Sequence, residues 1–191
     1  MFLSDIAKPA VASGHRFDQG RHWAASLALT FAQRDDVTRM VQARHHGPLR
    51  VQRPFYPEGS GEACHVYLLH PPGGLVSGDA LTIHARVASG AHALLTTPAA
   101  NKLYKADSQG VAWTQHTRLS VEDDATLEWL PQETIAFDGS KGEQRTQIDL
   151  HGSARCLGWE VMALGRPASD LPYISGRIEQ HFRLTLDGKS L

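Results

Sequence analysis

The sequence contains little cysteine and no long apolar run. Only Cys64 and Cys156 are present, far apart and without a C-x-x-C pair, so neither a disulfide framework nor a thiolate zinc site is expected. No stretch of about 18 apolar residues occurs, and the N-terminal residues lack the apolar centre of a signal peptide. We therefore expect a cytoplasmic protein that makes no contact with a membrane.

The sequence also has no large excess of charge. Its net charge is −1, and 20% of its 191 residues are charged against 41% that are hydrophobic, which is typical of a globular domain. Because no face is strongly basic, a nucleic-acid partner is not expected. The length suits one domain with its own core. We predict a flexible N-terminal arm at 1–20 and a single β domain at 21–191.

Motifs for nucleophilic or metal catalysis are missing. There is no G-x-S-x-G, H-E-x-x-H or phosphate-loop sequence, and the 11 histidines show no spacing of a preassembled metal cage. Glu128, Glu133 and Asp138 could act as general acid and base across a sheet, which makes a hydrolase or lyase the alternative function. Acids at strand ends are, however, often no more than hydrogen-bonded.

Alternating apolar residues indicate an all-β domain. They occupy every second position from Trp23 to Phe31, from Leu81 to Val87 and from Ile178 to Leu186, the period of a strand with one buried face. Such runs recur about every 10–15 residues with turn signals between them. One short helix is predicted at Ala99–Lys105, with Thr97 as its cap and Pro98 in its first turn. Lys102 and Lys105 would then share a face that could meet an acidic partner.

Two segments hold carboxylates in unusual surroundings. The run HPPGGLVSGD at 70–79 must turn sharply, because proline fixes φ and glycine allows positive φ. It is either a tight connection between two strands or a shaped surface that presents Asp79 to a partner or a metal. Glu160 lies between Trp159 and Val161, so it either faces solvent or is buried with a cation or a partner such as Arg166.

Four segments taken together resemble the UreD family of urease accessory proteins, called UreH in some organisms. They are HPPGGLVSGD, TTPAANKLYK, LEWLPQETIAFDG and GWEVMALGRPAS, in this order, and the resemblance spans about residues 20–190. It implies a β-helix-like stack of strands with one or two short helices. It also implies a non-catalytic chaperone that joins UreF and UreG on apo-urease so that nickel can be delivered, with a homodimer possible within the accessory complex.

The resemblance further implies a transient nickel relay at Asp79 and Glu160, with no tightly bound cofactor and nickel only in transit. Two departures stand out: Asp170-Leu171-Pro172-Tyr173 replaces the family's Gly-Glu-x-Phe run, and the chain ends at Leu191, without the family's C-terminal portion. A stable metal-storage protein is a third possible reading. The remaining motif positions expected to bind partners or shape the motifs are Pro72, Gly73, Gly74, Gly78, Thr97, Asn101, Lys102, Tyr104, Trp129, Pro131, Gln132, Glu133, Gly165 and Arg166.

Overall fold

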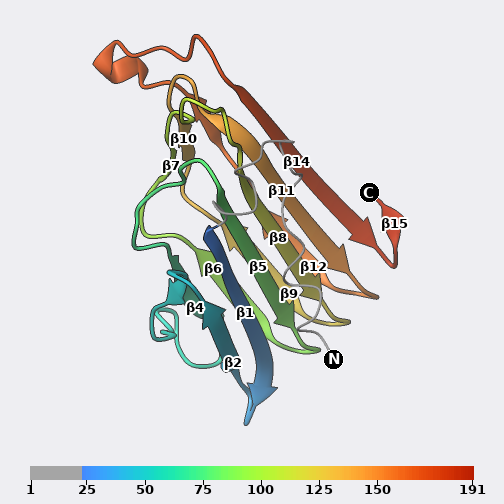
Figure 1. The fold of residues 1–191 in the computed structure, drawn as a ribbon. Coiled ribbons are helices and arrows are strands. Elements are labelled where there is room, and N and C mark those ends of the chain that lie inside the picture. Colours follow the sequence, from blue (N-terminus) through green and yellow to red (C-terminus); the bar gives the residue numbers. More distant parts are fainter. Residues whose placement is uncertain (1–22) are drawn as a thin grey trace.

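The strands wind into a β-solenoid whose successive coils each add one strand to each of three sheets (Figure 1). The computed structural model describes residues 23–191, so the predicted arm at 1–20 lies outside the described residues. From β5 onward the chain passes from the largest sheet to the second, then to the third, and back to the largest. This arrangement confirms the predicted β-helix-like stack of strands.

The largest sheet has seven strands in the order β15-β14-β11-β8-β5-β1-β2. Its five central strands are parallel, whereas β2 and β15 pair antiparallel at the two edges. The strands are β1 (Trp23–Arg34), β2 (Val37–His46), β5 (Asp79–Val87), β8 (Trp113–Val121), β11 (Lys141–Leu150), β14 (Arg177–Leu186) and β15 (Lys189–Ser190).

The other two sheets are smaller. The five-stranded sheet has the order β12-β9-β6-β4-β3, and the three-stranded sheet has the order β13-β10-β7. The five strands are β3 (Arg50–Val51), β4 (Cys64–Leu69), β6 (His92–Thr96), β9 (Thr126–Leu130) and β12 (Arg155–Gly158). The three strands are β7 (Asn101–Leu103), β10 (Thr134–Ala136) and β13 (Met162–Leu164).

The core lies between the inner faces of the sheets. The predicted alternation is confirmed in β5, where Leu81, Ile83, Ala85 and Val87 are all buried. Each fully buried aliphatic side chain of this kind contributes roughly 1.5–3 kcal/mol of transfer free energy. The parallel register places equivalent residues of successive coils beside one another. The apolar residues therefore form ladders along the solenoid.

The helix predicted at Ala99–Lys105 is wrong. Residues Asn101–Leu103 form β7, which pairs in parallel with β10. The Leu75 N–H also donates to the Lys102 carbonyl at 2.7 Å, so partners from other coils satisfy the backbone that a helix would have satisfied locally. Without this helix, the predicted helix face shared by Lys102 and Lys105 does not exist either.

A single turn of 3₁₀ helix, η2 (Pro167–Ser169), is the helical element of the described residues. The short helix implied by the resemblance therefore exists, but at a different place from the one expected. Across residues 23–191, no helix has the length and apolar character needed to cross a membrane.

Candidate functional site

The glycine-rich segment forms two tight turns that join β4 to β5. The Gly73 N–H donates to the His70 carbonyl at 2.8 Å, and the Asp79 N–H donates to the Val76 carbonyl at 3.1 Å. At Gly74, an added Cβ would lie 2.5 Å from the Lys102 carbonyl oxygen, so no larger residue fits this close approach. The predicted connection between two strands is confirmed.

Asp79 closes the second turn and begins β5. Its Oδ2 accepts a hydrogen bond from the Val76 N–H at 2.9 Å, and the residue is 7% exposed. Burial raises the pKa of the Asp79 carboxyl, and the Val76 N–H and nearby His70 offset part of this rise. Asp79 thus holds the turn, and it also brings a carboxylate against an imidazole inside the protein.

His70 lines two partly open cavities, and exposed residues such as Val161 and Val76 form part of their walls. One cavity of about 210 Å³ is lined by His70, Asp79 and Tyr104. Another of about 130 Å³ is lined by His70 and Glu160. His70 Nδ1 is buried and has no hydrogen-bond partner among the described residues, and burial lowers the pKa of its ring, with Asp79 offsetting part of the shift. A neutral imidazole is therefore shared by two cavities, one lined by Asp79 and the other by Glu160.

Glu160 enters the 130 Å³ cavity from the loop between β12 and β13. Its carboxylate accepts from Trp129 Nε1 at 3.1 Å, Gln144 Nε2 at 2.9 Å and the Thr146 hydroxyl, with Gln180 Nε2 more distant at 3.4 Å. These donors come from β9, β11 and β14, so three successive coils converge on one carboxylate. All four donors are neutral.

Arg166, considered as one possible partner of Glu160, does not take that role. The Arg166 guanidinium lies over the Phe137 ring, 4.4 Å from its centroid, and the Arg166 N–H donates to the Leu171 carbonyl at 2.7 Å. Gly165 precedes it with φ 76°, and a Cβ there would lie 2.7 Å from the same carbonyl oxygen. These two motif residues shape a turn near η2 and take no part in the interior site.

Several of the other predicted residues gather at the cavities. Thr97 links two loops there, because its hydroxyl accepts from the Gln132 N–H at 3.0 Å and donates to the Ala99 carbonyl at 3.2 Å. Tyr104 packs edge-on against Phe137, with ring centroids 5.2 Å apart. The residues that line the 130 Å³ cavity include Gly73, Thr97, Asn101, Trp129, Pro131 and Gln132. Those lining the 210 Å³ cavity include Pro72, Gly74 and Tyr104.

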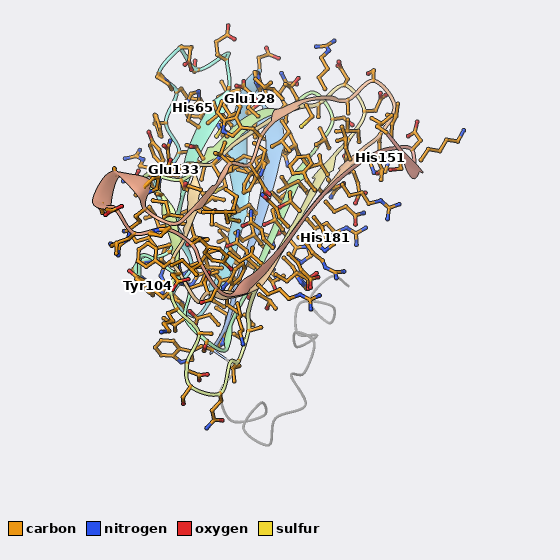
Figure 2. All side chains as sticks on the ribbon, turned by 90° about the horizontal axis from the view of Figure 1, so that it is seen from above. His65, Tyr104, Glu128, Glu133, His151 and His181 are labelled. Carbon is orange, nitrogen blue, oxygen red and sulfur yellow. The ribbon has the colours of Figure 1, made fainter. Side chains whose placement is uncertain are left out.

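The acids of the hydrolase alternative are not brought together. Glu128 pairs with His92, with 2.8 Å between Oε1 and Nε2, whereas Glu133 is exposed; Figure 2 shows the two at separate places. Asp138 accepts from the N–H groups of Ser175 at 2.7 Å and Ile174 at 2.9 Å, and these bonds lower its pKa. Each carboxylate thus has its own structural partner.

Sequence reasoning missed His70 and the glutamines. A histidine before two prolines carries no local sign that it will separate two cavities. Gln144 and Gln180 are partners in the parallel register of β11 and β14, but the coils differ in length, so no fixed repeat marks them. The apolar neighbours of Glu160, Trp159 and Val161, do not mark its position either, because both are exposed whereas Glu160 is half-buried.

The fold and the site together define a class of protein. It is a parallel β-solenoid whose polar groups converge on cavities, with neutral donors gathered around a single carboxylate. A partly open arrangement of this kind suits the holding or passage of a small polar or cationic species.

Comparison with known proteins gives the family. Residues 24–191 match the model of the UreD urease accessory protein family, and the chain belongs to that family. It is 67% identical over 188 residues to urease accessory protein UreD 1 of Psychrobacter cryohalolentis, a match covering 96% of this chain and 62% of the relative. It is 70% identical over 185 residues to UreD of Marinobacter nauticus, covering 94% of this chain and 62% of the relative.

A third relative, UreD of Chromohalobacter salexigens, is 66% identical over 190 residues, which cover 96% of this chain and 61% of the relative. The chain therefore spans about three fifths of the length of these relatives. The resemblance found in the four motifs is confirmed. All three relatives are named as accessory proteins, which agrees with the prediction that this chain is not an enzyme.

Proposed function

We propose that this chain acts in urease maturation as a scaffold that holds UreF and UreG on apo-urease, and that its interior provides a path for nickel between Asp79 and Glu160. Family membership supports the role in maturation. One structural observation supports the path: the half-buried carboxylate of Glu160 receives only neutral donors and lines a cavity with unsatisfied polar atoms. The two parts of the proposal can be tested separately.

The unsatisfied atoms favour a polar or cationic occupant of the cavity. His70 Nδ1 and Gln144 Oε1 are both buried, lack hydrogen-bond partners among the described residues and belong to residues lining the 130 Å³ cavity. Because buried polar groups are nearly always satisfied, water or an ion is the expected partner. A cation would also compensate the charge of Glu160, which its neutral donors stabilise without neutralising.

The donor set suits a passing nickel ion. Imidazole nitrogen and carboxylate oxygen are both ligands for first-row divalent metals. Asp79, His70 and Glu160 offer such atoms singly along adjoining cavities, not as one closed cage. A site with few protein ligands binds weakly, and weak binding lets the cargo leave. Cys64 and Cys156 are both free thiols, which is consistent with a protein that functions in the reducing cytoplasm.

Co-expression tests the proposal. The chain is produced with UreF, UreG and apo-urease in nickel-supplied cells that lack their own UreD, and pull-down and urease activity are both measured. Glu160→Gln and Asp79→Asn should leave the pull-down unchanged and lower urease activity, because each removes a charge and keeps the shape. Glu62→Gln, at an exposed position before β4, is the matched control and should leave both unchanged.

The outcomes separate the two parts. Full urease activity in the Glu160→Gln and Asp79→Asn variants would overturn the nickel path and leave the scaffold standing. No pull-down and no activity from the unaltered chain, with a full-length relative working in the same cells, would overturn the scaffold for this chain. Tight stoichiometric nickel binding by the chain alone would favour storage over transit.

A further inference from the structure

The outer face of the largest sheet carries a cluster of acids and imidazoles that the interior path does not use. Glu143 of β11 lies directly beside Glu179 of β14 in the parallel register. His116 of β8 and His181 of β14 lie beside Arg145 on its two sides, two residues further along. Figure 2 shows His181 on β14, away from Glu128 of the second sheet. Three successive coils therefore place these groups side by side, at nearby positions along their strands.

The distances between the potential ligand atoms are close to those found between the ligands of one metal ion. Those of Glu143, Glu179 and His181 are all within 4.8 Å of one another. His181 Nε2 is 3.8 Å from Glu143 Oε1 and 3.7 Å from Glu179 Oε2. Metal–ligand bonds of about 2.0–2.2 Å hold neighbouring ligand atoms about 3–4 Å apart. Small side-chain rotations would therefore bring all three onto one ion.

His116 supplies a second, independent observation. Its side chain is 45% exposed, but its Nε2 atom is covered, has no hydrogen-bond partner among the described residues and lies 3.9 Å from Glu143 Oε2, too far for a hydrogen bond. An unpaired nitrogen thus stands beside a carboxylate.

The two glutamates lie side by side, and one oxygen of each faces a histidine. Like charges directly opposite each other in a sheet are destabilising, and the Glu143 side chain is only 13% exposed. Arginines offset this repulsion: Arg145 Nε donates to Glu143 Oε1, and Arg177 Nη2 lies 2.7 Å from Glu179 Oε1. Glu143 Oε2 and Glu179 Oε2 remain oriented toward the two histidines.

We propose that Glu143, Glu179 and His181, with His116 beside Glu143, form a binding site for a divalent transition-metal ion such as Zn²⁺ on the outer face of the largest sheet. The mixed imidazole and carboxylate set favours such an ion over Mg²⁺, which prefers oxygen ligands and its own waters. The bound ion ties β8, β11 and β14 together. This site does not depend on the interior path, because none of its residues lines either cavity.

Calorimetric titration of the 191-residue chain with Zn²⁺, in excess Mg²⁺, tests the site. Glu160→Gln serves as the background, so that binding in the interior is weakened and the outer site is measured. Glu179→Gln and His181→Gln should each raise the Kd at least about tenfold, as loss of a ligand requires. His92→Gln is the matched control, because it breaks a histidine–glutamate pair on another sheet, and it should leave the Kd unchanged.

Arg145→Gln gives a test of opposite sign. It keeps every proposed ligand and removes a unit charge that competes for Glu143, so it should lower the Kd severalfold. If Arg145→Gln instead weakened binding as much as the ligand variants do, or if those variants bound Zn²⁺ normally, the cluster would be a salt-bridge network and the proposal would be wrong. Circular dichroism checks that each variant folds, and Arg145→Gln decides the question if a ligand variant does not.

Discussion

Replacing Glu160 with alanine removes the acceptor on which side chains from three coils converge, so it tests whether this carboxylate organises the interior. Trp129 Nε1, Gln144 Nε2 and the Thr146 hydroxyl would each lose their partner. A buried donor left unsatisfied costs about 1–3 kcal/mol. The contact with Gln180 is long, at 3.4 Å, and adds little.

Water limits the loss. The adjoining cavity of about 130 Å³ can admit several molecules, and these can pair with some of the freed donors. We therefore expect the lower end of the range for each donor, or about 3 kcal/mol in total for Glu160→Ala. This is a large fraction of the roughly 5–15 kcal/mol that stabilises a typical domain.

Glu160→Gln is the informative comparison. The glutamine keeps one carbonyl oxygen for Trp129 and Thr146, and its new amide group can donate to Gln144 Oε1, which has no partner among the described residues. The variant loses mainly the charge assistance of the bonds, so we expect a cost of about 1 kcal/mol.

Urea unfolding followed by tryptophan fluorescence measures both variants, since Trp113 and Trp129 are buried. Unchanged m-values would show that the same surface unfolds in each variant. A cost below about 1 kcal/mol for Glu160→Ala, or equal costs for the two variants, would refute the view that the carboxylate organises these donors.

Three further perturbations follow from the geometry. Gly142→Ala would place a Cβ 2.3 Å from the Trp113 ring, so we expect a loss of about 1–3 kcal/mol and a Tm lower by several degrees in a thermal scan; an unchanged Tm would contradict the close approach. Asp138 has a lowered pKa because the Ser175 N–H donates to it, so its contribution is present above the unfolded pKa of about 3.9 and is lost as pH falls through the folded value. Asp138→Asn should therefore destabilise the protein at pH 7 but much less at pH 3, and an equal loss at both pH values would argue against the shift. Asp36 has φ 61° in the β1–β2 turn, so Asp36→Gly should stabilise the hairpin by about 0.5–1 kcal/mol in urea unfolding, and a loss of stability would contradict this.

The long strands could be predicted from the sequence because each carries its own signal. In β5, the alternation of Leu81 and Ile83 with polar neighbours predicted the buried face that the structure has. The short strand β7 carries no such signal: three residues are too few for a period, and Thr97-Pro98 locally favoured a helix. Pairing with distant strands overrode that local preference.

Some residues of the candidate site could likewise be predicted from the sequence, and others could not. Asp79 and Glu160 stood out because acids are rare in such apolar or glycine-rich surroundings, and the family resemblance linked them to a metal. The cavities and His70 could not be predicted, because the winding of the coils decides which side chains face one another. Arg166 was a reasonable partner for Glu160 by distance along the chain, yet the turn at Gly165 directs it to Phe137.

The reversed strand β2 has a consequence for self-association. A run of parallel strands ending in an unpaired edge would be a template on which the same run in another molecule could continue. β2 covers the β1 side of the ladder with a strand of opposite direction, so the parallel register of the ladder ends at β1. Its exposed Arg39 and Arg44 add positive charge that repels a second such edge. The hairpin thus acts as a terminator that keeps this end of the sheet from seeding fibrous growth.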